Sequence, residues 1–285
     1  MLFSASSKAL FRVLNLSGGV ESTAMYLMAV EGVITPKPEF AIFADTKWES
    51  RKTYEMIDWL DDRFGTEIPI RRVSTGNIKS HWLAGAADIT KKVSTAPFFV
   101  RGDNGRYATL RRWCTRDFKI TAIRQEVGKL LKEWQGGKKS YPAGAVEQWI
   151  GLARDEVVRI KDSGARYVDH RYPLIEAGYT QNDCVNWLRS NGYPVPPSSG
   201  CVGCPYHSDE EWREMIEARP DEFAEAVNLD AAIRGGFRGS KQEVFLHRSL
   251  IPLADVDFTK RELPVLQPKL FATSWSEECA GVCGI

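Results

Sequence analysis

The sequence predicts an α/β protein built on an open, mostly parallel sheet with helices on both faces. Short apolar runs typical of buried strands alternate along the chain with longer amphipathic stretches typical of helices. The first apolar run ends in two glycines that lead directly into a helical pattern. The chain has 285 residues, of which 43% are hydrophobic and 26% charged, which is enough for one large α/β domain with a smaller module.

We divide the chain at residue 192, with the sheet domain over 1–192 and a smaller cysteine-bearing region packed on it over 193–285. Strands are expected over residues 9–16, 39–44, 68–73, 145–152 and 171–175. Helices are expected over residues 22–30, 52–64, 117–134, 180–191, 209–218 and 221–233. Residues 74–105 have weak periodicity, and we expect them to form an insertion that covers the substrate.

Composition argues against a membrane protein and says little about charged partners. No apolar run approaches the length of a membrane span, and residues 1–11 are too short and too polar for a secretory signal. We therefore expect a cytoplasmic protein. The formal net charge is +1, but arginines are concentrated over residues 101–116. That cluster predicts a solvated face or an anionic-ligand pocket, with nucleic-acid contact as the remaining alternative.

The turn after the first expected strand has the chemistry of an anion site. Gly18 and Gly19 accept backbone angles closed to other residues and let a ligand approach the main chain. Ser17, Ser22 and Thr23 place hydroxyls beside the N–H groups that open the next helix. Those amides and the helix dipole favour a phosphate. The alternative is a plain turn between a strand and a helix.

The string Ser-Gly-Gly-x-x-Ser-Thr over 17–23 resembles the phosphate loop of the PP-loop superfamily, which has the adenine nucleotide alpha hydrolase-like fold. That superfamily includes N-type ATP pyrophosphatases, tRNA thiolation enzymes and PAPS reductases. The resemblance implies that the loop binds ATP, or a preformed adenylyl sulfate, together with Mg²⁺. Many members have Asp where this chain has Glu21, so Glu21 is a candidate for holding the metal or a loop amide.

Two further strand ends carry side chains that resemble PAPS reductase segments. Asp45 and Thr46 follow the second strand, at the edge where open parallel sheets place ligand groups. Gly151 lies at the end of the fourth strand and Arg154 follows it, and the resemblance implies that Arg154 meets the anionic end of the substrate. A planar guanidinium suits phosphate or sulfate oxygens. Asp45 and Arg154 are therefore candidate catalytic residues, whereas without the resemblance both segments are ordinary helix starts.

Six cysteines in a chain without a secretion signal favour metal binding, redox chemistry or burial over disulfides. Cys201 and Cys204 are separated by two residues, a spacing at which two thiolates hold one metal or cluster. Cys114 precedes an expected helix among arginines, which favours its thiolate form. Cys184 lies inside an expected helix, where we expect it to be buried.

The order of these cysteines resembles that in iron–sulfur APS reductases and in DndC-like DNA sulfur-modification proteins. The resemblance implies a [4Fe-4S] cluster on Cys114, Cys201, Cys204 and Cys283, with zinc on the same ligands as the alternative. The pair Glu278-Cys279 is similar to the start of the C-terminal Glu-Cys-Gly whose thiol attacks sulfur in PAPS reductases. Cys279 is therefore a candidate catalytic thiol, or an alternative cluster ligand.

We expect a PAPS reductase-like PP-loop enzyme that uses ATP to adenylate an acceptor and couples this step to sulfur transfer. The acceptor is left open, with nucleic acid as one candidate. One alternative is a reductase that converts adenylyl sulfate to sulfite through Cys279. Another is a nucleotide-binding module whose metal is structural. The expected partners are an adenine nucleotide, a sulfur or electron donor protein and a second copy of the chain.

Overall fold

The computed structural model describes residues 8–102, 107–134, 136, 141–196, 198–239 and 242–259. These residues fall into two compact units. The first unit comprises the described residues of 8–76 and 115–200, and the second those of 77–114 and 201–259. Each unit therefore combines two separate stretches of chain, so the contacts do not follow one boundary along the sequence.

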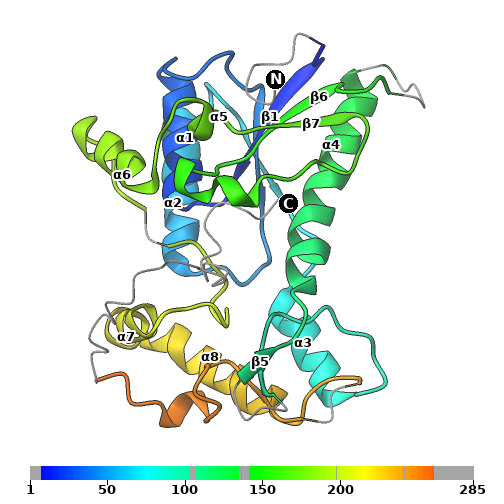
Figure 1. Ribbon diagram of the computed structural model, residues 1–285, viewed down its shortest axis with the longest axis vertical. Helices are drawn as coiled ribbons and strands as arrows, with labels where there is room; N and C mark the ends of the chain where they lie inside the picture. Colours follow the sequence, from blue (N-terminus) through cyan, green and yellow to red (C-terminus); the bar gives the residue numbers. More distant parts are fainter. Residues whose placement is uncertain are drawn as a thin grey trace. The chain divides into compact units, whose positions relative to one another are not determined.

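The first unit is organised around a five-stranded sheet with the strand order β3-β2-β1-β6-β7 (Figure 1). Its strands are β1 (Phe11–Leu16), β2 (Phe40–Ala44), β3 (Ile70–Val73), β6 (Val146–Trp149) and β7 (Val168–Arg171). All neighbouring strands are parallel, and the central strand β1 pairs Leu14 with Ala41 of β2 and with Trp149 of β6. The predicted α/β class with a parallel sheet is thus confirmed.

Helices cover both faces of this sheet (Figure 1). They are α1 (Val20–Val30), α2 (Arg51–Phe64), α4 (Thr121–Trp134), α5 (Pro173–Glu176) and α6 (Gln181–Ser190). On one face Leu14 packs with Met25 of α1 and Ile57 of α2, and on the other Val13 packs with Ile123 of α4. Successive strand residues point to opposite faces, so a strand covered on both faces needs a continuous apolar run.

Three local features differ from the expected elements. The strand expected over 171–175 lies at 168–171, because Pro173 begins the short helix α5 at a position where proline is well accommodated. The helix expected over 117–134 starts with a π-helical segment, η1 (Thr115–Ile120), that runs into α4. The segment after β6 is a 3-10 helix, η2 (Arg154–Arg159).

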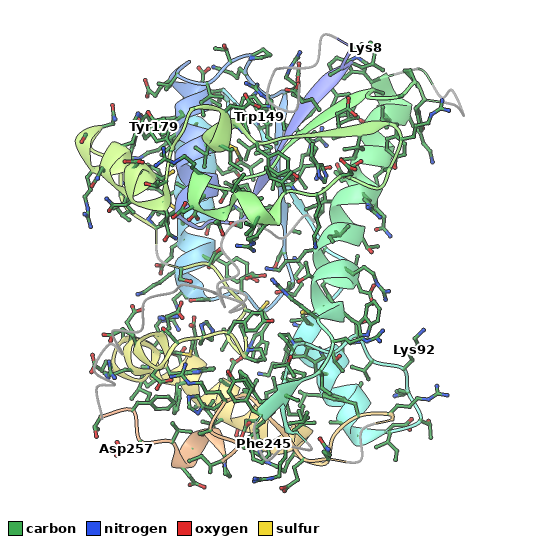
Figure 2. The ribbon with its side chains drawn as sticks, in the orientation of Figure 1. Lys8, Lys92, Trp149, Tyr179, Phe245 and Asp257 are labelled. Atoms are coloured by element: carbon green, nitrogen blue, oxygen red, sulfur yellow. The ribbon has the colours of Figure 1, made fainter. Side chains whose placement is uncertain are left out.

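The second unit contains helices and a small antiparallel sheet in the order β5-β4-β8. Its elements are α3 (Ile78–Ala87), β4 (Phe99–Arg101), β5 (Tyr107–Thr109), α7 (Asp209–Ala218), α8 (Pro220–Ile233), β8 (Val244–Phe245) and η3 (Leu253–Asp255). Phe245, labelled in Figure 2, lies opposite Phe99 of β4. Trp82 is buried and its indole N–H donates to the Ser94 carbonyl at 2.9 Å. Within the stretch 74–105, residues 78–87 and 99–101 therefore contribute a helix and a strand to a folded core.

No helix among the residues described above has the length and apolar character that crossing a membrane requires.

Candidate functional site

The candidate site begins where β1 leads into α1. β1 has β2 on one side and β6 on the other, so successive connections leave the centre of the sheet in opposite directions. At such a switch point the loops after the two strands separate and open a crevice at the carboxyl ends of the strands. The loop at this point is Ser17-Gly18-Gly19, and the first turn of α1 follows it directly.

Three serine hydroxyls form a directed chain along this loop. Ser17 Oγ accepts from the Gly19 N–H at 3.3 Å and from the Ser199 hydroxyl at 3.4 Å. Ser17 therefore donates its own proton to Ser22 Oγ, which lies 2.9 Å away. The Ser22 hydroxyl in turn donates to the Gly19 carbonyl at 3.3 Å. The loop is thus held in one conformation by side chains that are polar and largely buried.

Glycines make room beside the first turn of α1. Gly18 has a φ of +79°, which a residue with a side chain rarely adopts. A Cβ on Gly19 would lie 2.9 Å from Ser199 Oγ, and one on Gly151 would lie 3.2 Å from both the N and the Cα of Ser22. The strand end of β6 therefore approaches the main chain of α1 where its first N–H groups lack acceptors within the helix.

Two of the predicted loop residues lie inside the first unit. Glu21 and Thr23 are 1% and 0% exposed, respectively. Cys184 of α6 is affected by the charge of Glu21. Burial makes the largest contribution to raising the pKa of the Cys184 thiol to about 12, and the charge of Glu21 makes the next largest. Cys184 itself is fully buried, as the sequence predicts. Glu21 is therefore placed in the packed interior near α6.

The predicted residues at the end of β2 hold the turn that follows. Asp45 Oδ1 accepts from the Tyr54 hydroxyl and from the Lys47 N–H, both at 2.7 Å, and Asp45 Oδ2 lies 2.9 Å from the Lys47 ammonium. Burial and the bond to Asp45 raise the pKa of Tyr54 above its usual range, so its hydroxyl stays a donor. The Thr46 hydroxyl donates to Glu49 Oε1 at 2.8 Å.

Lys119 is a candidate residue that sequence reasoning does not single out. It extends from the π-helical segment η1, is 9% exposed, and its ammonium lies 3.2 Å from Glu49 Oε1. Together with Asn15, Ser17 and Phe43 it lines a narrow pocket at the carboxyl ends of β1 and β2. Single π-helical turns frequently occur at functional sites. The only signal in the sequence is a lysine in an arginine-rich stretch, which is equally typical of a solvated face.

Ser199 is a second candidate site residue that the sequence does not single out. The Ser199 hydroxyl donates to Ser17 Oγ at 3.4 Å, and the carbonyl of the next residue, Gly200, accepts from the Ser50 N–H at 3.1 Å. No local pattern predicts this contact, since Ser17 and Ser199 are 182 positions apart.

Gly151 and Arg154, predicted together, have different surroundings. Gly151 is buried against the first turn of α1, as described above. Arg154 is exposed at the start of η2, where its main-chain N–H donates to the Tyr179 carbonyl at 2.7 Å. Arg159, at the end of η2, pairs with Glu156. The structure thus brings Gly151 to the loop and presents the guanidinium of Arg154 to solvent.

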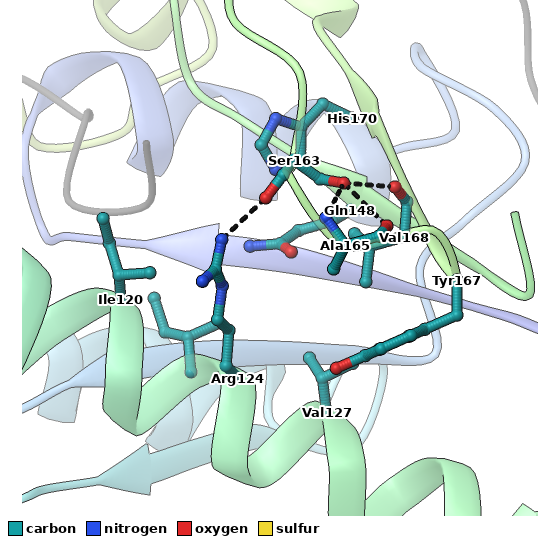
Figure 3. A pocket seen from close by; sticks show the side chains of 10 residues that line it. Ile120, Arg124, Val127, Gln148, Ser163, Ala165, Tyr167, Val168 and His170 are labelled. Atoms are coloured by element: carbon teal, nitrogen blue, oxygen red, sulfur yellow. Dashed lines mark hydrogen bonds between the residues drawn. The ribbon is translucent and has the colours of Figure 1, made fainter.

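Another pocket of the first unit lies between α4 and β7 (Figure 3). Arg124 Nη2 donates to the Ser163 carbonyl at 2.7 Å, and the Ser163 hydroxyl donates to the Val168 carbonyl at 2.6 Å. Burial lowers the pKa of His170, whose Nδ1 lies 3.0 Å from the Lys161 carbonyl. These polar groups are directed at the main chain of residues 161–168, so they hold that loop against α4.

In the second unit, Cys201 and Cys204 lie in one tight turn. The Cys204 N–H donates to the Cys201 carbonyl at 3.1 Å, and His207 Nε2 donates to the same carbonyl at 3.0 Å. Burial lowers the pKa of His207. Because the Cys201 carbonyl can only accept, Nε2 is a ring nitrogen that carries a proton. Cys201 is 8% exposed and Cys204 is half-buried. Two thiols in one turn are a suitable pair of ligands for a soft metal.

The segment that carries Cys114 contacts this turn. The Arg112 guanidinium stacks over the Tyr206 ring, with 5.4 Å between Cζ and the ring centroid. Cys114 is half-buried and its N–H donates to the Thr95 carbonyl at 3.0 Å. Within the described ranges, no three His, Cys, Asp or Glu side chains form a group placed to hold a metal ion. Cys279 and Cys283 lie outside those ranges, so the four-ligand set stays a prediction.

Comparison with known proteins gives distant similarities. No family model matches the chain. An uncharacterized 37.8 kDa protein in the gpa 5′ region of Escherichia phage 186 is 21% identical over 282 residues, which cover 84% of this chain and 80% of that protein. Among solved structures, phosphoadenylyl-sulfate (PAPS) reductase from Candida auris, in a phosphate complex, is similar with a TM-score of 0.42 and 10% identity. That match covers 65% of this chain and 75% of the other.

Proposed function

We propose that the first unit binds the phosphate groups of an adenine nucleotide at the β1–α1 loop. We further propose that the protein is a PAPS reductase-like PP-loop enzyme. In this proposal ATP, with Mg²⁺, adenylates an oxygen of an acceptor and releases pyrophosphate, and a sulfur nucleophile then displaces AMP from the acceptor. The supporting observation is the close approach of Gly151 to the first turn of α1, beside the hydroxyls of Ser17, Ser22 and Ser199.

The physical basis for anion binding at this loop is simple. The first N–H groups of α1 have no acceptor within the helix, and the helix dipole adds partial positive charge at the same point. Lys119, whose ammonium also lies 3.2 Å from Glu49 Oε1, places a cationic group at the pocket that includes Ser17. Pyrophosphate gains negative charge as it leaves the α-phosphate of ATP. Donors already held in place stabilise that charge without rearrangement during the reaction.

We assign the remaining predicted residues by their surroundings. Asp45 and Thr46 hold the turn after β2, so we propose that they border the nucleotide and position the loop. Arg154 has an exposed guanidinium after the strand next to β1, which supports a role at the anionic end of a substrate. Cys279 remains the proposed nucleophile of the alternative reaction, the reduction of an adenylyl sulfate.

The turn shared by Cys201 and Cys204 supports the proposal of a metal centre. Cys201 and Cys204 share one turn, and the Cys114 segment contacts that turn through Arg112. We propose that these three thiolates and Cys283 hold a [4Fe-4S] cluster, with zinc as the alternative. Such a cluster would supply a site for binding sulfur or for transferring electrons. Anaerobic purification followed by iron, sulfide and zinc analysis decides between the two metals.

The nucleotide proposal is tested by calorimetric titration of the full chain with ATP, adenosine, adenylyl sulfate and PAPS, each with Mg²⁺. We expect ATP to bind, and Ser22→Ala to weaken it by about 1 kcal/mol, or roughly fivefold, because one hydrogen bond at the loop is lost. Ser190→Ala, an exposed serine at the end of α6, is the matched control and leaves the affinity unchanged.

Lys119→Met provides a second readout. It should weaken ATP far more than adenosine, since a charge acts on phosphates, while Lys129→Met on the exposed side of α4 should change neither. Pyrophosphate release in the presence of candidate acceptors then separates the two enzymatic alternatives. Productive binding of adenylyl sulfate, with sulfite as product, favours the reductase. No binding of any adenine nucleotide would contradict the proposal.

A further inference from the structure

Three side chains of the second unit form a hydrogen-bonded series that the proposed function does not use. His247 Nε2 lies 3.0 Å from Asp209 Oδ1, and His247 Nδ1 lies 2.7 Å from Ser249 Oγ. His247 is 5% exposed and stacks edge-on against Phe258, with 5.6 Å between the ring centroids. Ser249, in contrast, is exposed. The series therefore runs from a carboxylate through a buried imidazole to a hydroxyl at the surface.

The protons in this series are assigned by one main-chain group. The Ser249 N–H lies 3.2 Å from His247 Nδ1, and an amide N–H can only donate. Nδ1 must therefore carry a lone pair, and the proton of the neutral imidazole resides on Nε2, where it is donated to Asp209. Because Nδ1 is an acceptor, the Ser249 hydroxyl must donate to it. The oxygen lone pairs of Ser249 are thus left for another group.

A helix start and a guanidinium adjoin the carboxylate of Asp209. Asp209 is the first residue of α7, where the helix dipole stabilises negative charge. Arg248 Nη2 donates to Asp209 Oδ2 at 3.1 Å. A carboxylate held in this way orients the imidazole and stabilises the imidazolium that forms when His247 takes a proton.

The backbone after Ser249 is unusual as well. Leu250 has a φ of +58°, a left-handed conformation that is a genuine outlier for a bulky residue. Its N–H donates to the His247 carbonyl at 3.2 Å, which closes a tight turn around Ser249. Such conformations persist only where the surrounding structure imposes them, and they are concentrated at functional sites.

We propose that Ser249 is a nucleophile that accepts an acyl group from an ester or thioester, with His247 as its general base and Asp209 as a positioning residue. Ser249 Oγ forms a bond to the carbonyl carbon while its proton passes to His247 Nδ1. The bond to the leaving alkoxide or thiolate then breaks, and that group takes the proton from Nδ1. Water repeats the two steps on the acyl-serine, releases the carboxylic acid and restores the hydroxyl.

An acyl group fits better than a phosphoryl group. A phosphoryl donor carries negative charge and needs a cation directed at it. The adjacent guanidinium, that of Arg248, donates to the carboxylate of Asp209. The neighbouring Ile251 exposes an apolar side chain, which suits the hydrocarbon part of an acyl donor.

The test is labelling of the full chain with an alkyl fluorophosphonate, which loses fluoride to an activated serine and leaves a stable adduct. Peptide mass spectrometry measures the labelling rate at Ser249. We expect adduct on this serine in the folded protein and none after denaturation in urea. Ser249→Ala abolishes this adduct, and Asp209→Asn and His247→Gln slow it at least tenfold. Ser80→Ala, an exposed serine of α3, is the matched control and leaves the rate unchanged.

Structural damage is separated from loss of the base in two ways. The melting temperature of each variant is measured, and a slowed rate counts only where that temperature is retained. If His247→Gln does not fold, Ser249→Cys replaces it: this thiol should react with iodoacetamide at least tenfold faster than that of Ser80→Cys. Absence of adduct at Ser249 in the folded wild-type chain, or equal rates in wild type and folded Asp209→Asn, would overturn the proposal.

Discussion

Replacing Gly151 by alanine tests the packing at the centre of the candidate nucleotide site. The new Cβ would lie 3.2 Å from the N and the Cα of Ser22 and 3.4 Å from its Cβ, where ordinary contacts are 3.4–4 Å. Two of these atoms are main chain, so no side-chain rotation relieves the contact. The strand end of β6 and the first turn of α1 must therefore separate by a few tenths of an ångström.

The size of the effect follows from that displacement. Overpacking of a tight contact costs about 1–3 kcal/mol in the free energy of unfolding. For a unit of this size, that cost lowers the melting temperature by roughly 3–10 °C. The same movement displaces the N–H groups that we propose for phosphate. Because hydrogen bonds to charged groups contribute about 1.5–3 kcal/mol each, we expect ATP to bind roughly 10-fold more weakly.

Gly128→Ala is the matched control for this experiment. Gly128 lies inside α4, and a Cβ at this position meets nothing within 4 Å. Alanine favours the helix, so this variant should gain about 0.5–1 kcal/mol and bind ATP like the wild type. Thermal melts and calorimetric titrations of both variants give the two quantities. If Gly151→Ala matches the wild type in melting temperature and in ATP affinity, the approach of β6 to α1 does not form the site.

Three further predictions concern groups in the first unit. Glu147 accepts from Trp149 Nε1 at 2.8 Å and lies within 3.7 Å of the guanidinium groups of Arg12 and Arg171, which also pair with Glu39 and Glu176. Glu147→Ala should therefore cost about 1–3 kcal/mol in urea unfolding, because the buried Trp149 N–H loses its acceptor, and a cost under about 0.5 kcal/mol would contradict this role. Cys184, with its pKa raised to about 12, should resist iodoacetamide at about pH 8 in the folded protein and react in urea; rapid reaction when folded would refute its burial. Burial lowers the pKa of His170 below its ordinary value of 6.5, so the unfolded chain binds more protons and stability should fall as the pH drops below about 6.5. His170→Gln should flatten that slope in melts across this range, and an unchanged slope would show that other groups cause it.

The parts of the fold that sequence predicts are those that one short stretch determines. The run from Phe11 to Leu16 is apolar at every buried position except Asn15, and the two glycines that follow must end the strand. Strand and helix positions of the sheet unit therefore match the expected ranges within a few residues, apart from β7. There, Pro173 stops the strand that an apolar pattern alone extends.

The parts that sequence does not predict depend on contacts between distant stretches. Ser199 reaches Ser17 only because the chain returns to the sheet after more than 180 residues, and neither serine carries a local signal for the other. Lys119 contacts Glu49 from a π-helical segment, and the periodicity of the sequence does not distinguish such a segment from an ordinary α-helix. The hydrogen bonds of His247 likewise join a loop to a helix start 38 positions earlier.

The second unit combines an early and a late stretch of the chain, and this has a consequence for how the protein is synthesised. Phe98 stacks on Phe237 with 5.6 Å between the ring centroids, and α3 packs against α8. The early stretch 77–114 therefore lacks these partners until more than a hundred further residues have left the ribosome. During that interval Trp82 and Phe98 are apolar surfaces of a nascent chain, the kind that chaperones recognise. A translation product that stops near residue 200 would keep them exposed for good, and quality control should remove it.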